Sequence, residues 1–358
     1  MKDFDTIVIG GGQSALACGY YLKKLGLSYI LLDDQATCGG GWLHTWESLT
    51  LFSPAEYSSL PGWMMPQSGN QFPTKFEVIN YLCAYEQRYK LSIQRPVKVT
   101  DVFKQDGRFS VVTDHGNFYA STVISATGSW QHPFVPTLPG IQEFAGEQLH
   151  SAAYKNALPF RGKRVLVVGG GNSGAQLLAE VSRSAETKWA TLTEPAFLPD
   201  DVDGRVLFNT ATAKYHALEK NAKTEPVELN LGNIVMVPGV KEARNRNVLH
   251  SAGNIKALTS TGVVWDNDLT EDFDTIIWCT GFKPALAHLN GLVSVNEKGH
   301  VALKGQQSVD SPGLWLVGYG NWTGFASATL IGVGRSARST VTQIAEYLNE
   351  KKLTNTTV

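Results

Sequence analysis

Short apolar runs, separated by glycines and by helical periodicity, recur along this chain. Residues 4–9 (FDTIVI) and 29–32 are nearly continuous in apolar side chains, as is typical of parallel strands buried on both faces. Between them, residues 13–25 place apolar side chains at helical spacing, and Gly26 stands where a helix C-cap is expected. The same order of strand, helix and strand returns in residues 164–168, 172–181 and 188–192. The pattern therefore predicts two β-α-β units and an α/β fold.

The rest of the chain supplies further elements around these two units. Residues 76–89 are predicted to form an amphipathic helix. Residues 97–103 and 109–113 alternate as antiparallel strands, with a turn at Asp106-Gly107. Three more buried strands and a long helix are predicted at residues 119–126, 274–279, 314–317 and 326–347. We expect the last strand and helix to belong to the same domain as the N-terminal strand.

Each β-α-β unit carries a glycine-rich loop between its first strand and its helix. The first loop follows GxGxxA and the second GxGxxG, at Gly10, Gly12 and Ala15 and at Gly169, Gly171 and Gly174. The first glycine permits a tight turn, the second lets backbone N–H groups approach a pyrophosphate, and the third small residue lets helix and strand pack closely. A glycine triplet alone is a weak signal, whereas strand, loop and helix in register are specific. One chain is therefore predicted to hold two dinucleotides.

The end of the second strand distinguishes the two units. Asp33 lies 21 positions after Gly12, where a carboxylate is expected to hydrogen-bond a ribose hydroxyl. The same count from Gly171 reaches Leu192, which is followed by Thr193. A carboxylate at this position favours NADH and an arginine favours NADPH. Because neither stands here, we predict weak discrimination, with both coenzymes usable.

Composition and charge limit the partners. The 358 residues hold 31 lysines and arginines against 32 aspartates and glutamates, so no strong field attracts nucleic acid or an anionic membrane. No apolar run is long enough to cross a bilayer, and the N-terminus leads into a strand without the apolar segment of a secretory signal. The four cysteines are scattered without a CxxC pair, which argues against a disulfide framework, a zinc site or a dithiol redox centre. We therefore expect a cytoplasmic protein with a small-molecule partner and no metal.

Three segments outside the loops are further candidates for binding. Residues 38–46 (CGGGWLHTW) could bring bare backbone and Trp42 or Trp46 against a flat cofactor, although a turn followed by core tryptophans would look the same. Ala126, Thr127 and Gly128 end a buried strand, where doubly wound sheets bind ligands, with a plain strand end as the alternative. The acidic turn at residues 199–204 lacks the spacing of a calcium loop and favours a helix cap or a solvated turn.

The segment between the two units carries a resemblance to a known family. Phe144, Gly146, His150 and Tyr154 match FxGxxxHxxxY, the fingerprint of the class B flavin-containing monooxygenases. The chain resembles the smaller bacterial members over nearly its whole length, through GGGWLHTWESLTLFSP, EPAFLPDDVDGRVLF, IWCTGF and GYGNWTGFASATLIG. These segments are similar to the small enzymes that accept either NADH or NADPH, and to the flavin monooxygenases of arsenic-resistance clusters.

The resemblance implies an FAD-binding domain with an inserted NAD(P)H-binding domain. Residues 1–155 and 283–358 would form the FAD domain, and residues 156–282 would bind NADPH or NADH. The implied FAD contacts are Gly10, Gly12, Gln13, Ser14, Ala15, Asp33, Gly40, Gly41, Trp42, His44, Val99, Ala126, Thr127, Gly128 and Gly320. The implied NAD(P)H contacts are Gly169, Gly171, Asn172, Ser173, Gly174, Leu192, Thr193, Thr280 and Gly281.

The resemblance also implies the chemistry. In the family, reduced FAD and O2 form a C4a-(hydro)peroxyflavin, which oxygenates a thioether or amine, or inserts oxygen beside a ketone in a Baeyer-Villiger reaction. Because the flavin carries this chemistry, no protein acid or base is assigned, and His150 and Tyr154 are expected to be structural. Larger members place an asparagine near flavin N5 where Phe52 stands here. A phenyl ring cannot make that hydrogen bond, so we expect Phe52 to shape the site while peroxide release competes with oxygenation.

Other functions use the same pair of nucleotide domains. An NAD(P)H oxidase or quinone reductase that makes mainly hydrogen peroxide needs nothing further and is the main alternative. A disulfide reductase would need a dithiol near the flavin, against which the cysteine pattern argues. A nucleotide-binding regulator without turnover is disfavoured by the two intact loops and Asp33. The expected partners are a small apolar organic substrate and O2, without nucleic acid or membrane, and the apolar face of the C-terminal helix allows a homodimer.

Overall fold

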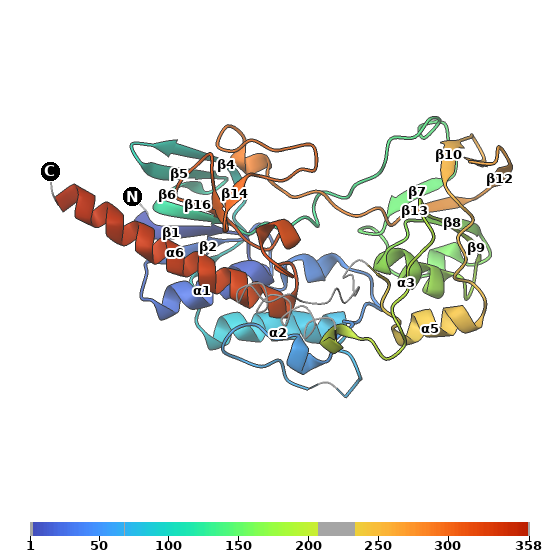
Figure 1. The fold of residues 1–358 in the computed structure, drawn as a ribbon, viewed down its shortest axis with the longest axis horizontal. Helices are drawn as coiled ribbons and strands as arrows, with labels where there is room; N and C mark the ends of the chain where they lie inside the picture. Colours follow the sequence, from blue (N-terminus) through green and yellow to red (C-terminus); the bar gives the residue numbers. More distant parts are fainter. Residues whose placement is uncertain (1–2, 68, 207–232, 357–358) are drawn as a thin grey trace, which may run out of the picture. The chain divides into compact units, whose positions relative to one another are not determined.

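The computed structural model describes residues 3–67, 69–206 and 233–356, and the chain divides into two compact units. The first unit comprises Met1–Leu43, Ser58–His132 and Phe282–Val358, and the second comprises His44–Tyr57 and Pro133–Gly281. Figure 1 shows that each unit has its own sheet and its own helices. The chain enters the second unit and later returns to the first, so the second is inserted into the first.

A nine-stranded sheet forms the centre of the first unit. Its strands are β1 (Asp3–Ile9), β2 (Tyr29–Leu32), β3 (Ile93–Gln94), β4 (Val99–Gln105), β5 (Arg108–Thr113), β6 (Gly116–Ser125), β14 (Leu303–Lys304), β15 (Gln307–Ser308) and β16 (Leu314–Leu316). The main path runs β14-β15-β16-β6-β1-β2-β3, and the β4-β5 hairpin joins it at β6. β1 is parallel to both of its neighbours, with Ile7 opposite Ile30 and Val123. The carboxyl ends of β1, β2 and β6 therefore meet at one edge of the sheet.

Three helices complete the first unit: α1 (Gln13–Lys24), α2 (Lys75–Arg88) and α6 (Leu330–Thr356). In Figure 1 α6 runs alongside α1, and the two helices pack together. α2 begins with a capping box, because Thr74 Oγ1 accepts from the Glu77 N–H at 3.3 Å while the Glu77 carboxylate accepts from the Thr74 N–H at 2.8 Å. Within the described residues, no helix combines the length and the apolar sequence that a membrane crossing needs.

The second unit holds a smaller parallel sheet in the order β7-β13-β8-β9. Its elements are β7 (Glu147–His150), β8 (Arg164–Val168), α3 (Asn172–Val181), β9 (Glu186–Ala190), α5 (Pro238–Asn245) and β13 (Thr275–Trp278), with an antiparallel sheet of β10 (Ile255–Leu258), β11 (Gly262–Trp265) and β12 (Thr270–Asp272). Val165 and Val167 of β8 pack into the cluster that contains α3 and α5, and Leu166 packs into the cluster that contains β10 and β11. Because alternate residues face opposite sides of a strand, the central strands are buried on both faces, and this burial produces the continuous apolar runs in the sequence.

Short 3-10 helices connect these elements: η1 (Gly40–His44), η2 (Ala55–Tyr57), η3 (Leu158–Phe160), η4 (Ala287–Leu289) and η5 (Asn321–Thr323). One of them, η5, precedes the last helix, which was expected to end at Tyr347 and ends at Thr356. The last helix was expected to start at Ala326 but begins at Leu330, because Ala326 has a φ of 53° and the Thr329 hydroxyl accepts from the Gly332 N–H at 3.0 Å as a cap.

The predicted α/β class with two Rossmann-like units is confirmed. The predicted hairpin is confirmed as well, since Asp106 and Gly107 have φ values of 50° and 72°, as a two-residue type I′ turn requires. The predicted return of the C-terminal strand to the first sheet is confirmed by the pairing of β16 with β6.

Candidate functional site

The first glycine loop, residues 10–12, joins β1 to α1. Gly10 has a φ of 122°, and a Cβ there would lie 2.5 Å from the carbonyl oxygen of Ala126, just beyond β6. Only glycine allows this backbone conformation together with this close approach. The Gly10 N–H donates to the Leu32 carbonyl at 2.8 Å, so the loop is fixed between the ends of β2 and β6. α1 therefore begins at the carboxyl edge of the sheet, where α/β proteins bind ligands.

The N-terminus of α1 offers backbone donors to a ligand. Gly12 is the N-cap, and among the described residues no side chain caps the helix, so the first-turn N–H groups and their partial positive charge face the loop. The Gln13 side chain connects the neighbouring segments: its Oε1 accepts from Trp42 Nε1 at 3.0 Å and its Nε2 donates to the Ala328 carbonyl at 2.6 Å. Trp42, the aromatic candidate of the glycine-rich segment, thus lies at the start of α1.

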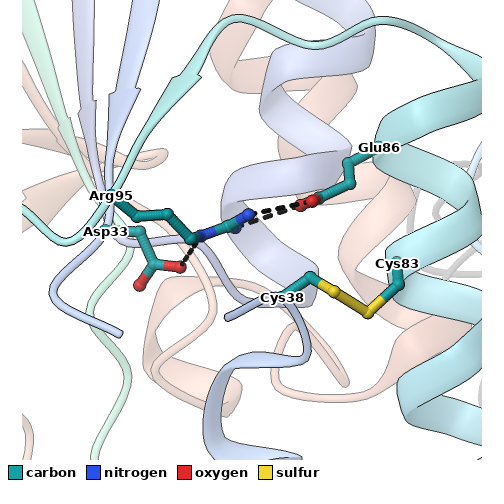
Figure 2. The surroundings of a disulfide bond; sticks show 5 residues. All are labelled: Asp33, Cys38, Cys83, Glu86 and Arg95. Atoms are coloured by element: carbon teal, nitrogen blue, oxygen red, sulfur yellow. Dashed lines mark hydrogen bonds and ion pairs between the residues drawn. A yellow bond between two sulfur atoms is a disulfide. The ribbon is translucent and has the colours of Figure 1, made fainter. Parts of the chain in front are cut away.

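Asp33, which Figure 2 shows beside Arg95, lies directly behind this loop. Its side chain is only 3% exposed, and a Cβ on Gly11 would overlap its carboxylate. Arg95 Nε donates to Asp33 Oδ2 at 2.9 Å, and the two Nη atoms of Arg95 donate to the Glu86 carboxylate at 2.8 and 3.0 Å. Burial raises the pKa of Asp33, and the Arg95 charge acts in the opposite direction. The result is a fixed carboxylate with a balancing charge directly behind the glycine loop.

The second glycine loop, residues 169–171, repeats this construction in the second unit. Gly169 has a φ of 124°, and a Cβ there would overlap the carbonyl oxygen of Cys279, just beyond β13. The Gly169 N–H donates to the Ala190 carbonyl at 2.8 Å, at the end of β9. Gly174 in the first turn of α3 admits no side chain either, because a Cβ would overlap the Gly169 carbonyl. The same backbone geometry is therefore built twice in one chain.

The hydrogen-bond register shows which residue corresponds to Asp33 in the second unit. Gly10 bonds to Leu32, the residue before Asp33, and Gly169 bonds to Ala190, the residue before Thr191. Thr191 is therefore the counterpart of Asp33, and Leu192, reached by counting 21 positions, lies one residue further and is 84% exposed. The Thr191 hydroxyl is 2.6 Å from the Ser251 hydroxyl. A pair of hydroxyl groups replaces the carboxylate at this position.

The strand ends beside the first loop are tied together by a chain of buried hydrogen bonds. The Thr127 hydroxyl donates to the Ala285 carbonyl at 2.7 Å, so it accepts its other bond, also 2.7 Å, from the Tyr319 hydroxyl. Tyr319 in turn accepts from Ser125 at 2.5 Å, and Ser125 accepts from His288 Nε2 at 3.0 Å. This direction of donation fixes the proton of neutral His288 on Nε2. Burial lowers the pKa of His288 to about 4 and also raises the pKa of Tyr319.

The FxGxxxHxxxY residues build one edge of the second sheet. Gly146 allows the chain to pass close to its neighbours, since a Cβ there would lie 2.5 Å from the Phe144 ring and 2.7 Å from the Asp274 carbonyl. His150 ends β7, where its Nδ1 accepts from the Ala152 N–H at 3.1 Å, and burial lowers its pKa. The Tyr154 ring stacks on Phe160 with 5.6 Å between ring centroids. In the structure this motif forms a strand, a turn and core packing.

The other predicted site residues occupy varied places. Around the first loop, Ser14 packs against Gly318, and a Cβ on Gly40 would lie 2.6 Å from the Gly12 Cα. Gly41 contacts Trp130, Ala15 is fully buried in α1, and Val99 begins β4 opposite Thr113.

Seven further predicted residues lie in the second unit. His44 accepts from Lys155 Nζ at 2.7 Å through its carbonyl, and the Phe52 carbonyl accepts from the Gly204 N–H at 2.8 Å. The Asn172 amide joins α3 to residues 233–235, through bonds of 3.2 Å to the Asn233 carbonyl and 2.9 Å from the Val235 N–H. The Thr280 hydroxyl donates to the Phe134 carbonyl, and at the next residue, Gly281, a Cβ would meet no described atom within 4 Å. Ser173 lies in the first turn of α3, and Thr193 is exposed beyond β9.

The acidic turn is held by ion pairs of its own. Asp200 accepts from Arg244 through both carboxylate oxygens at 2.7 Å, and Asp203 accepts from Arg205 Nε at 2.9 Å. The acidic turn is therefore joined to α5 through Arg244, and its Asp203 pairs locally with Arg205. The last two residues of the predicted motif around it, residues 207–208, lie outside the described residues.

The expectation of unpaired cysteines is wrong. Cys38 and Cys83 form a disulfide with 5.3 Å between their Cα atoms. The two residues are 45 positions apart, so no CxxC-type spacing marks them, and the pairing arises because α2 packs against the loop that follows β2. The chain therefore does contain a cysteine pair, which a disulfide reductase would need.

Sequence reasoning also missed Gly11, Arg95, His288 and Tyr319. Gly11 could have been found, because the residue between the two motif glycines faces the acid in a tight loop. Arg95, His288 and Tyr319 carry no local signal, since each acts on residues 62 or more positions away in the sequence.

Both loops are surrounded by backbone that faces open space. In the first unit, a Cβ on Gly128 or Gly320 would meet no described atom within 4 Å, and the same holds for Gly171 and Gly281 in the second unit. Gly128, Gly320 and Gly281 also have φ values of 67°, 98° and 84°, which favour glycine. A dinucleotide fits such a site, because its phosphates and flat rings approach bare backbone closely.

Comparison with known proteins gives consistent matches over nearly the whole chain. Residues 7–318 match the family described as pyridine nucleotide-disulphide oxidoreductase. The structure of a flavin-containing monooxygenase from Stenotrophomonas maltophilia is 48% identical, with a TM-score of 0.89 and coverage of 97% of this chain and 100% of that one. The uncharacterized oxidoreductase CzcO of Bacillus subtilis is 30% identical over 344 residues, 95% of this chain and 99% of the relative. The indole-3-pyruvate monooxygenase YUCCA1 of Oryza sativa is 26% identical over 93% of this chain and 89% of the relative.

Proposed function

Because the chain belongs to the pyridine nucleotide-disulphide oxidoreductase family, among its flavin monooxygenases, we propose that it is an FAD-dependent monooxygenase that consumes NADH or NADPH. The observation that carries this proposal is the repeated glycine loop, which ends against a buried acid in one unit and against a pair of hydroxyl groups in the other. One site suits a cofactor that stays bound, and the other suits a coenzyme that exchanges.

In this proposal the first unit holds FAD. The N–H groups at the start of α1 bind its pyrophosphate, and Asp33 accepts from the adenosine ribose. Gly40, Gly41, Trp42, Gly128 and Gly320 line the remaining cradle, and the bare backbone at Gly128 and Gly320 leaves room for a flat ring. When bound, FAD supplies two-electron redox chemistry with nicotinamide and with O2. The protein contributes binding, orientation and exclusion of water.

The second unit takes the nicotinamide nucleotide at Gly169, Gly171, Ser173 and the first turn of α3. Thr191 and Ser251 stand at the ribose position, and hydroxyl groups donate and accept equally well. They suit a ribose 2′-hydroxyl and a 2′-phosphate alike, which supports use of both NADH and NADPH. Leu192 and Thr193 are both exposed and would lie at the rim of this position.

The proposed substrates are small organic molecules that contain a thioether or a ketone. The rice relative is named an indole-3-pyruvate monooxygenase, and a 25% identical relative is named senecionine N-oxygenase, so both relatives are named for oxygenation of a small organic molecule.

A coupling measurement tests the proposal. The purified holoenzyme is reduced without oxygen by NADH and, separately, by NADPH, and is then mixed with O2 and either methyl p-tolyl sulfide or cyclohexanone. We expect reduction rates within about fivefold of each other, which is about 1 kcal/mol, and formation of sulfoxide or lactone in step with coenzyme consumption. Sulfide plus added hydrogen peroxide, without coenzyme, controls for oxidation by free peroxide. If the flavin is reduced but all electrons appear as peroxide with both substrates, the protein is an NAD(P)H oxidase or quinone reductase.

Phe52 provides a matched variant for the same measurement. We propose that Phe52→Asn raises the share of electrons that reach product, because an amide supplies a hydrogen bond that a phenyl ring cannot. Phe52→Leu removes the ring without adding a donor and should leave that share at or below the wild-type value. If the share of electrons that reach product is the same in the wild type and in both variants, Phe52 does not influence the reaction.

A further inference from the structure

The Cys38–Cys83 disulfide joins the loop after β2 to the side of α2, within the first unit (Figure 2). The loop leads from Asp33 to Gly40, and the helix supplies Cys83 near its middle. The same picture shows the Glu86 carboxylate one helical turn from Cys83, holding Arg95 against Asp33. The helix is therefore joined to the segment that carries Asp33 twice, directly by the disulfide and through Arg95 by the Glu86 ion pair.

One face of α2 makes all of these contacts. Ile79, Cys83 and Glu86 are spaced by four and three residues, so they lie on one side of the helix. Ile79 packs against Gly39, whose Cβ would lie 3.2 Å from Ile79 Cγ2, and Gly39 is the residue directly after Cys38. The disulfide thus stands between an apolar contact and an ion pair along one seam.

The other end of this seam is the first glycine loop. A Cβ on Gly40 would lie 2.6 Å from the Gly12 Cα, so the backbone two residues after Cys38 touches the N-cap of α1. A Cβ on Gly11 would overlap the Asp33 carboxylate, so that acid also touches the loop. A change in the position of residues 33–40 would therefore alter the backbone at the proposed pyrophosphate position and the acid at the proposed ribose position.

The disulfide joins two partly exposed residues, and of the two free cysteines Cys18 is buried and Cys279 is partly exposed. Cys18 is fully buried, and burial raises the pKa of its thiol well above the usual range, while burial raises the pKa of Cys279 to about 12. Since the thiolate is the reactive form, the raised pKa values disfavour reaction at both free cysteines. Thiol chemistry in this chain is thus directed to the one disulfide that borders the first loop.

We propose that the Cys38–Cys83 disulfide is a site of thiol-disulfide exchange that sets how firmly FAD is held, an inference that rests on the proposed binding of FAD in the first unit. A dithiol reductant attacks one sulfur as its thiolate, the S–S bond breaks, and a mixed disulfide forms. The second thiol of the reductant then displaces the remaining protein sulfur. The two cysteines gain two electrons and two protons, and the reductant leaves as its own disulfide. Reduction frees residues 33–40 from α2 at one of three contacts, and FAD dissociates faster.

The experiment follows FAD release from the holoenzyme, by the rise in flavin fluorescence after dilution, with and without dithiothreitol. For the wild type we expect release about tenfold faster after reduction, which corresponds to about 1.4 kcal/mol. Cys83→Ser should release FAD at the fast rate under both conditions, and it also controls for direct action of the reductant on the flavin. Cys18→Ala alters a buried free cysteine and should respond as the wild type does. Glu86→Gln cuts the ion-pair link, so we expect faster release that dithiothreitol accelerates further.

A thiol titration of the unfolded protein accompanies this measurement. Without reductant it should find two free thiols, Cys18 and Cys279, and after reduction four. Four thiols before reduction, or equal FAD release from the oxidised and reduced wild type, would overturn the proposal. A purified protein that binds no FAD at all would instead overturn the proposed function, so the two failures are distinct.

Discussion

The two glycine loops solve the same problem in the same way, yet the strands behind them end differently. Gly10 and Gly169 have φ values of 122° and 124°, and each approaches the carbonyl oxygen of a residue just beyond a neighbouring strand, Ala126 or Cys279. Behind the first loop stands Asp33, buried and paired with Arg95, whereas behind the second stands Thr191, hydrogen-bonded to Ser251. The loop geometry is thus common to both units, and the residue behind the loop is what differs between them.

This difference accords with a cofactor that stays and a coenzyme that leaves. A buried carboxylate with a fixed guanidinium is organised before the ligand arrives, so little ordering is lost on binding. An exposed rim such as that at Leu192 and Thr193 leaves part of the ligand in water and favours rapid exchange. The disulfide beside Asp33 adds a further constraint to the first site.

Replacing the first glycine of each loop by alanine should have the largest effect, and the effect should differ between the two sites. Gly10→Ala and Gly169→Ala each force a side chain into a backbone region that costs about 1–3 kcal/mol for a residue other than glycine, and each adds a clash with a carbonyl oxygen. We expect Gly10→Ala to purify largely without flavin, measured by absorbance at the flavin band relative to protein. We expect Gly169→Ala to retain flavin while its reduction by NADH and by NADPH slows about 100-fold, near 3 kcal/mol.

Gly26→Ala is the matched control for these two variants. Gly26 also has a positive φ, 69°, but a Cβ there meets no described atom within 4 Å, so only the backbone cost remains. It should bind flavin and be reduced at the wild-type rate. If Gly169→Ala also lost its flavin, the two loops would not act as separate sites.

The sequence predicts the loops well because they depend on local physics. A continuous apolar strand, a glycine turn and an amphipathic helix are each specified by neighbouring residues, and the predicted β8 and α3 match the observed bounds. Asp33 follows from a fixed spacing within one β-α-β unit. By contrast, counting to Leu192 misses Thr191 by one residue, because β9 meets its loop one position earlier than the motif length assumes.

The parts that sequence reasoning missed depend on contacts between distant segments. Arg95 reaches Asp33 across 62 positions, Tyr319 reaches Thr127 across 192, and Cys83 pairs with Cys38 across 45. No periodicity or spacing rule encodes such pairs, since they depend on which helix packs on which loop. The disulfide is the clearest case, because spacing between cysteines along the chain argued directly against it.

Lowering the pH should test the chain of buried hydrogen bonds that joins the strand ends of the first unit. That chain of bonds includes His288, whose pKa is lowered to about 4 by burial, from an ordinary value near 6.5. The unfolded chain therefore binds the extra proton below pH 6.5, and the folded chain does so only near pH 4, so stability falls as the pH drops through this window. Between pH 6.5 and 5 the loss is about 2 kcal/mol, from about 1.4 kcal/mol per pH unit. It is measured as the free energy of urea unfolding at each pH.

His288→Gln keeps an amide donor near the position of Nε2 and removes the titration. Its stability should vary less with pH between 6.5 and 5 than that of the wild type, although it is lower at pH 7. An unaltered slope in His288→Gln would place the acid sensitivity elsewhere in the chain.

Leu192→Arg should give the smallest effect and tests the second site alone. An exposed guanidinium at the rim can pair with a 2′-phosphate but gains little from a 2′-hydroxyl, and exposure to water limits the gain to about 1 kcal/mol. We therefore expect the ratio of kcat/KM for NADPH over NADH to rise about fivefold, mainly through KM for NADPH, at low ionic strength. Leu192→Met preserves size without charge and should keep the wild-type ratio. If the ratio stays constant in Leu192→Arg, then Thr191 and Ser251 set the coenzyme choice and the rim does not. The second site would then recognise the ribose only at the position where the first site carries Asp33.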